Sequence, residues 1–376
     1  MGFDIHILGT SSARPTGSRQ VSGSLVVCDD GVAIVDAGEG FQSRFAVQRR
    51  RMKQFGDTQI KVGRVDVLCL THGHLDHTWG VLPWLHTLSL DKRDKPLLVI
   101  GPTSGEVLDS LLSNSKLPEG ISNSDLIIQW RSWHQLGGTS QQLGFPVRWI
   151  LGDVENDRWV ELLPDSNSVL ELEKMPQPIG WSENKIKPLA TNHTVPSCGW
   201  HFSSKGKKGK FDRLRAAELK LTETQRAGLA KGEDQTLADG KILSASEFRG
   251  PNSGGISVVL SGDTSEMSKG ITSIENCNVL VHESTFLEEW SEHAKNYLHS
   301  TASGAARTAL SSGAKHLVLT HFGARTKGTE EMLSQAKQQL EDSQVTLSAA
   351  SDGDRIHVSD SGKITHNFWG EHGWSN

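Results

Sequence analysis

Three imidazoles and one carboxylate lie within six consecutive residues, in the H-x-H-x-D-H segment His72, His74, Asp76 and His77. The segment follows residues 65–70, an aliphatic run that predicts a buried strand. Imidazole nitrogen and carboxylate oxygen are ligands for Zn²⁺, Mn²⁺ or Fe, and four such side chains are too crowded for one tetrahedral ion. The spacing therefore predicts two ions side by side. A polar loop rich in histidine is the alternative, and this spacing directly after a strand disfavours it.

Further polar side chains follow predicted strands later in the chain. His193, Asp263 and His321 each come directly after an apolar run, where α/β folds place their chemistry. Taken singly, they could be a loop histidine, a helix N-cap and a core imidazole. Together they predict a shared centre in which Asp263 bridges two ions. The predicted ligands are His72, His74, His193 and Asp263 on one ion, and Asp76, His77, Asp263 and His321 on the other.

The predicted chemistry is hydrolysis. A water or hydroxide between two metal ions has a lowered pKa and can act as a nucleophile, and Asp76 could serve as its general base. His299 precedes a predicted helix instead of following a strand, so we expect it to bind no metal. It could donate a proton to the leaving oxygen, with Glu283 orienting it. The alternative is an exposed histidine beside a helix cap.

The chain has 376 residues, of which 36% are hydrophobic and 22% are charged, and its formal net charge is −5. Any polyanion must therefore be bound by a local basic patch. Arg49 to Arg51 with Lys53 are interpreted as a solvated helix face. Four scattered cysteines favour free thiols in a reducing compartment. The N-terminal residues predict a strand and no stretch reaches transmembrane length, so we expect a cytoplasmic protein without membrane contact.

Closely spaced strands, at 5–8, 24–27 and 32–35, lead into the strand before the H-x-H-x-D-H segment. This order predicts a sheet of consecutive strands with helices outside, and not a doubly wound βαβ repeat. Residues 137–188 mix tryptophan, proline and charge, which predicts an insertion with limited structure of its own.

Several motifs together resemble the ribonuclease Z family of the metallo-β-lactamase superfamily. They are the H-x-H-x-D-H segment, D-A-G-E-G-F-Q at 36–42, H-T-V-P-S-C-G-W at 193–200, S-G-D-T at 261–264, H-E-S-T-F at 282–286, H-S-T at 299–301 and T-H-F-G-A-R at 320–325. The resemblance implies an α/β fold of metallo-β-lactamase type, an αβ/βα four-layer sandwich. It further implies one domain over residues 1–376, an insertion at about 137–188, and a protruding tRNA-binding arm at about 205–250.

The implied activity is zinc-dependent endonucleolytic removal of the 3′ trailer from precursor tRNA, leaving a tRNA 3′-hydroxyl. The resemblance also implies two Zn²⁺ per chain, with Mn²⁺ or Fe as possible substitutes, and a homodimer. Basic residues of the arm can neutralise phosphates. These predicted RNA-binding residues are Lys205, Lys207, Lys208, Lys210, Arg213 and Arg215.

Departures from the family pattern keep alternatives open. The arm has L-T-E-T-Q at 221–225 where the family usually carries a Gly-Pro-rich turn, and Gly323 and Thr326 replace its usual Ser and Tyr. A metallo-β-lactamase-fold hydrolase of small phosphodiesters or esters is therefore the alternative function. A metal-stabilised RNA-binding protein without turnover is disfavoured, because a structural zinc needs no open two-metal site.

Overall fold

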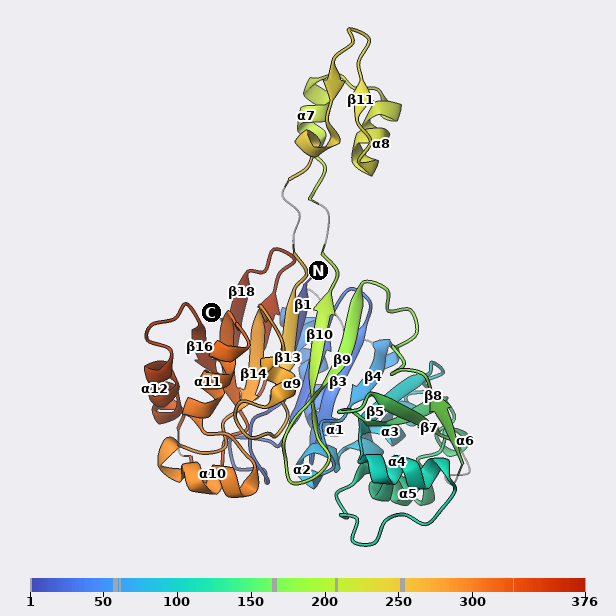
Figure 1. Ribbon diagram of the computed structural model, residues 1–376, viewed down its shortest axis with the longest axis vertical. Coiled ribbons are helices and arrows are strands. Elements are labelled where there is room, and N and C mark those ends of the chain that lie inside the picture. The colour runs from blue at the N-terminus through green and yellow to red at the C-terminus, as the bar shows by residue number, and fades with distance from the viewer. Residues whose placement is uncertain are drawn as a thin grey trace.

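Two β-sheets stand face to face, with helices covering both outer faces, in the computed structural model of this chain (Figure 1). The structure describes residues 2–56, 60, 62–163, 168–206, 209–250, 254–326 and 328–375. The helix–sheet–sheet–helix arrangement is the predicted αβ/βα sandwich. Within the described residues, no helix combines the length and the apolar character that crossing a membrane requires.

The larger sheet contains most of the strands of the N-terminal half and the last strands of the chain. Its strands are β1 (Phe3–Gly9), β2 (Gly23–Val27), β3 (Val32–Ala37), β4 (Val65–Cys69), β5 (Leu97–Pro102), β6 (Val147–Asp153), β7 (Arg158–Leu162), β8 (Val169–Leu172), β17 (Arg355–Val358), β18 (Ile364–Gly370) and β19 (Gly373–Ser375). Their order across the sheet is β19-β18-β17-β1-β2-β3-β4-β5-β6-β7-β8. As predicted, β1 to β4 are neighbours in both sequence and space.

The smaller sheet has the order β16-β15-β14-β13-β10-β9. Its strands are β9 (Asn184–Ala190), β10 (Cys198–Ser204), β13 (Ser257–Leu260), β14 (Val279–Glu283), β15 (His316–Thr320) and β16 (Thr346–Ala349). Since β9 and β13 both run antiparallel to β10, they run parallel to each other, and β13, β14 and β15 pair in parallel. The C-terminal ends of β9, β13, β14 and β15 therefore lie at one edge of the sheet.

The helices of the sandwich are short. They are α1 (Phe41–Phe55), α2 (Leu75–Thr78), α3 (Val81–Leu90), α4 (Gly105–Leu112), α5 (Leu126–Gln135), α6 (Ser140–Leu143), α9 (Lys269–Thr272), α10 (Ser291–Tyr297), α11 (Ala302–Ser311) and α12 (Glu330–Gln339), with 3-10 turns η1 (Val62–Arg64) and η3 (Glu288–Trp290).

Three apolar clusters hold these layers together. One packs α1, α3, α4 and α5 on the larger sheet, the second lies between the sheets, and the third packs α9, α11 and α12 on the smaller sheet. Strand β4 contributes to two of them, because Leu68 faces the helices while Val67 and Cys69 face the other sheet. Burial on both faces explains its unbroken aliphatic run.

The expectation of limited structure at 137–188 is wrong. Strands β6, β7 and β8 extend the larger sheet beyond β5, and β9 begins the smaller sheet. Trp149 and Trp159 are buried in strands β6 and β7, which pair antiparallel around the turn at 154–157. Pro146, Pro176 and Pro178 lie between strands, but many charged residues lie within the strands at half-buried or exposed positions, as do Glu161 in β7 and Lys187 in β9.

A small unit projects from the sandwich beyond the end of β10 (Figure 1). It comprises α7 (Arg213–Glu218), α8 (Glu223–Lys231), β11 (Gln235–Thr236), β12 (Ile242–Leu243) and the 3-10 turn η2 (Ala245–Phe248). It has its own apolar cluster, composed of Ala216, Leu221, Leu229, Leu243, Ala245 and Phe248. We call residues 209–250 the arm; they lie at the opposite end of the molecule from α2 (Figure 1).

Candidate metal centre

The seven predicted ligands meet at the C-terminal edge of the two sheets. The loop after β4 carries His72 to His77, and its Thr71 carbonyl accepts a hydrogen bond from the Cys198 backbone N–H at the start of β10, at 2.8 Å. The loops after β9, β13 and β15 bring His193, Asp263 and His321 to the same edge. Side chains separated by up to about 250 residues of sequence are thereby brought together. Their role as ligands remains a prediction.

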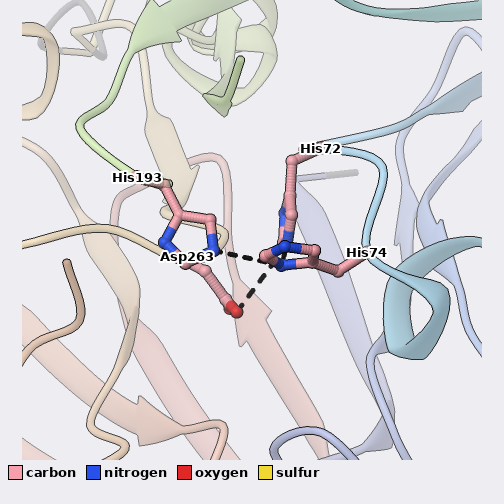
Figure 2. A group of neighbouring side chains, drawn as sticks. All are labelled: His72, His74, His193 and Asp263. Carbon is pink, nitrogen blue, oxygen red and sulfur yellow. Dashed lines mark hydrogen bonds and ion pairs between the residues drawn. The ribbon is translucent and has the colours of Figure 1, made fainter. Parts of the chain in front are cut away.

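The first group contains His72, His74, His193 and Asp263. Figure 2 shows the three rings and the carboxylate turned toward a common space. The Nδ1 atom of His74 lies 3.0 Å from His72 Nε2 and 3.2 Å from His193 Nε2. Asp263 Oδ2 lies 3.8 Å from His72 Nε2.

The second group contains Asp76, His77, Asp263 and His321. The Nε2 atoms of His77 and His321 are 3.3 Å apart, and they lie 3.4 Å and 3.2 Å from Asp263 Oδ1. Asp76 Oδ2 lies 3.6 Å from His77 Nε2 and 3.5 Å from His321 Nε2. Asp263 thus presents one oxygen to each group, as a carboxylate bridging two cations would.

The hydrogen bonds around these side chains fit metal ligation. Asp263 Oδ1 is buried and makes no hydrogen bond among the described residues, an arrangement that costs free energy unless a cation is present. The Nδ1–H of His193 donates to the Leu298 carbonyl at 3.1 Å, which leaves the Nε2 lone pair facing the centre. Neutral imidazoles with one nitrogen so occupied are the usual metal ligands. The first group offers three nitrogens and one oxygen, and the second offers two nitrogens and two oxygens, and both donor sets suit a Zn²⁺-type ion.

Asp36 at the end of β3 fixes His77, and sequence reasoning gave it no role. Its carboxylate is buried and accepts from the His77 Nδ1–H at 2.7 Å. It also accepts from the Thr71 backbone N–H at 2.7 Å and from the Thr71 hydroxyl at 2.8 Å. The signal available was an aspartate directly after an apolar strand, the same signal that singled out Asp263. Asp36 therefore orients a predicted ligand without being in either candidate group.

His299 and Glu283 lie beside the centre, where the sequence predicted them. The Nδ1 of His299 is 2.7 Å from Glu283 Oε1 and 3.9 Å from Asp263 Oδ2. Burial lowers the pKa of the His299 imidazole, but the Glu283 carboxylate outweighs that effect and raises this pKa to about 9. An imidazole held protonated next to the candidate ligands can supply a proton.

Glu283, His299 and His321 are also close enough together to be considered a metal site. The hydrogen bonds of Glu283 argue against this assignment. Its Oε1 accepts from the backbone N–H groups of Thr264 and Ser300, at 3.2 and 3.0 Å, in addition to His299. Its Oε2 accepts from the backbone and the hydroxyl of Thr285, at 3.0 and 2.7 Å. A carboxylate with five donors orients its neighbours more readily than it binds an ion.

Thr285 is a second residue that the sequence did not single out. Because its hydroxyl proton is donated to Glu283, its oxygen can only accept from His321 Nδ1, which lies 3.0 Å away. This contact leaves His321 Nε2 facing Asp263. His321 itself has a left-handed backbone, with φ of 57°. Residues other than glycine seldom adopt this conformation, although histidine adopts it more readily than most.

The predicted RNA-binding residues that the structure describes lie beyond the end of β10, away from this centre (Figure 1). Lys205, Lys210 and Arg213 are exposed at the base of the arm, whereas Lys207 and Lys208 lie outside the described residues. Arg215 is partly engaged within the arm, because its guanidinium pairs with Glu247 at 2.8 Å and lies 5.0 Å from the centre of the Phe248 ring.

Comparison with known proteins places these features in a family. Residues 16–93 match the family model described as the metallo-beta-lactamase superfamily. A ribonuclease Z from Prochlorococcus marinus is 30% identical over 328 residues, which cover 86% of this chain and 89% of the relative. A ribonuclease Z from Borreliella burgdorferi is 27% identical over 365 residues, covering 96% of this chain and 98% of the relative.

Solved structures share the fold at lower identity. The short form of human tRNase Z has a TM-score of 0.53 and 21% identity, covering 95% of this chain and 99% of that one. The metallo-beta-lactamase fold protein YhfI from Bacillus subtilis has a TM-score of 0.56 and 15% identity, covering 94% of this chain and 99% of that one. The predicted metallo-β-lactamase fold is therefore confirmed.

Proposed function

The chain belongs to the ribonuclease Z family, whose members are metal-dependent endoribonucleases, and from this premise we propose that it removes the 3′ trailer of precursor tRNA by phosphodiester hydrolysis. The products would be a tRNA with a free 3′-hydroxyl and a trailer with a 5′-phosphate. The convergence of seven histidine and aspartate side chains on one edge of the sandwich carries the proposal.

We propose that His72, His74, His193 and Asp263 hold one Zn²⁺ and that Asp76, His77, Asp263 and His321 hold a second. Mn²⁺ or Fe would suit the same donors. When bound, such ions polarise a phosphodiester and lower the pKa of a water molecule toward neutrality. Asp36 and Thr285 keep His77 and His321 oriented with their Nε2 atoms toward the centre.

The remaining residues handle protons. Asp76 Oδ2 faces His77 and His321 and accepts a hydrogen bond from the Ala13 backbone N–H at 2.7 Å. It is placed to take a proton from the attacking water. As the P–O3′ bond breaks, the developing alkoxide needs a proton, and His299 is positioned to give it. Glu283 acts through His299, since it holds the ring in place and favours its protonated form.

The arm would bind the tRNA away from the scissile bond. Exposed Lys205, Lys210 and Arg213 at its base support phosphate contacts, and we include Lys207, Lys208 and Arg215 in the same surface. A homodimer is proposed from the family resemblance alone. A cytoplasmic location is supported by the four cysteines, all buried and unpaired, which fit a reducing compartment.

The test is incubation of the purified protein with an unprocessed precursor tRNA and, separately, with bis-p-nitrophenyl phosphate. Mapping the ends of the RNA products should show one cut, with a 3′-hydroxyl on the tRNA. Turnover of the small ester without any RNA cleavage would overturn the proposal in favour of a hydrolase of small phosphodiesters.

A further inference from the structure

A groove of about 700 Å³ opens beside the candidate metal centre, and His193 is part of its lining. One wall comes from the larger sheet, namely residues 102–106 between β5 and α4 and residues 153–156 between β6 and β7. The other wall comes from the smaller sheet, namely residues 190–197 and 268–269. Its volume falls within the roughly 300–1,000 Å³ typical of small-ligand sites.

The wall from the larger sheet is acidic. Glu106 and Glu155 are exposed, and their side chains form no hydrogen bond or ion pair with the described residues. Asp153 accepts from the Asn156 side chain at 2.8 Å. The nearby Arg158 pairs with Asp109 at 2.6 Å, so it does not neutralise the two glutamates. Free carboxylates repel phosphate and accept hydrogen bonds from amino groups.

The opposite wall offers hydrogen-bond donors and a positive charge. Ser268 has only 5% of its surface exposed, and its hydroxyl has no hydrogen-bond partner among the described residues. It precedes α9 but makes no capping bond to that helix. The neighbouring Lys269 is exposed, and no ion pair with a described residue engages it. A buried hydroxyl without a partner is costly, so its presence points to a ligand group at this wall.

We propose that this groove is a subsite for one nucleotide flanking the scissile bond, with its phosphate at Ser268 and Lys269 and its base edge at Glu106 and Glu155. The positively charged wall then faces the negatively charged phosphate, and the negatively charged wall faces the hydrogen-bond donors of the base. Adenine, cytosine and guanine present exocyclic amino groups to the carboxylates, whereas uracil has none. His193 both lines the groove and belongs to the first candidate ligand group, so a nucleotide in the groove would lie next to the metal centre. The inference rests on the proposed RNA cleavage.

The test uses precursor tRNAs in which each nucleotide flanking the cut is varied in turn among the four bases. The wild-type protein should process the uridine variant at one of these positions more slowly than the others. The double variant Glu106→Gln with Glu155→Gln should lose this preference. Lys269→Ala should raise KM about tenfold with kcat retained, and should lower the slope of log KM against log salt by about 1. Ser268→Ala should also raise KM.

The matched control is Lys337→Ala, which removes an exposed lysine from α12 on the outer layer and should leave KM and kcat unchanged. Thermal unfolding and metal content should be the same in all variants. The subsite would be overturned if Lys269→Ala and Lys337→Ala had the same KM and kcat and if the wild-type protein processed all four base variants at the same rate. A wild-type protein that cuts none of the precursors would instead overturn the proposed function itself.

Discussion

Replacing Asp36 with asparagine tests whether a residue outside the candidate ligand set governs the metal centre. The carboxylate accepts three hydrogen bonds, from the Thr71 backbone, the Thr71 hydroxyl and His77 Nδ1. An asparagine side chain has one oxygen and one NH₂ group. If its oxygen stays on the Thr71 N–H, its NH₂ faces His77 Nδ1, and two donors would then oppose each other.

His77 can relieve this conflict only by moving its proton from Nδ1 to Nε2. Nε2 is the atom that faces Asp263 and His321, at 3.4 and 3.3 Å, and once protonated it has no lone pair for a cation. Loss of such an orienting contact typically costs 10- to 100-fold in metal affinity, or about 1.4 to 2.7 kcal/mol. We expect Asp36→Asn to lower metal affinity by this factor, with RNA cleavage falling in parallel.

The assay is elemental analysis after dialysis against graded Zn²⁺ concentrations, with precursor tRNA cleavage measured on the same samples. Asp66→Asn is the matched control, because Asp66 is also an aspartate that accepts hydrogen bonds but lies near the start of β4, whereas the candidate centre follows the end of β4. The Asp66 carboxylate accepts from the Val32 backbone N–H at 3.2 Å and from the Trp181 indole N–H at 3.1 Å. The control should bind metal as the wild type does. Wild-type affinity and turnover in Asp36→Asn would refute the assigned role of Asp36 in orienting His77.

Four further results are expected. Asp76→Ala should abolish cleavage, and near-normal turnover would contradict its proposed roles as ligand and base. His299→Ala should lower kcat by about 10²- to 10⁴-fold with metal content unchanged by elemental analysis, and loss of metal would make His299 a ligand. Lys210→Ala with Arg213→Ala should weaken tRNA binding and reduce its salt slope by about 2, whereas an unchanged slope would remove the arm from the interface. Burial raises the pKa of the Asp4 carboxyl, but hydrogen bonds from His357 and Arg355 outweigh it and hold that pKa below its usual value. This contribution to stability is therefore present above about pH 4 and lost at lower pH. Asp4→Asn should lower Tm near neutral pH and make Tm decrease less steeply as the pH falls below about 4. Identical curves of Tm against pH for the variant and the wild type would contradict this contribution of Asp4 to stability.

Local signals in the sequence were sufficient to predict that the seven candidate ligands lie close together, whereas their binding of metal stays a prediction. The spacing of His72 to His77 after an apolar run is a short-range pattern, and His193, Asp263 and His321 repeat the signal of a polar residue at a strand end. Parallel strand ends bring such residues to one edge, so the α/β reading alone predicts their convergence. The confirmed αβ/βα sandwich was implied by the family resemblance, whereas the strand pattern alone predicted a sheet of consecutive strands with helices outside.

What the sequence did not reveal depends on contacts between distant segments. Asp36 is 41 residues from His77, and Thr285 is 36 residues from His321, so neither role can be read from neighbouring residues. The segment at 137–188 was misjudged for a related reason. Trp149 and Trp159 are strand residues that pack against other parts of the fold, whereas prolines between the strands and charged residues on partly exposed strand positions dominate the local composition.

The apolar cluster of the arm, from Ala216 to Phe248, is separate from the three clusters of the sandwich. Two units stabilised by different sets of contacts can open at different free energies. Substitutions that loosen or reshape the arm would thus leave the hydrolytic centre folded. If the arm binds RNA as we propose, its specificity could change during evolution while the chemistry stays constant, and the arm could be exchanged as a module.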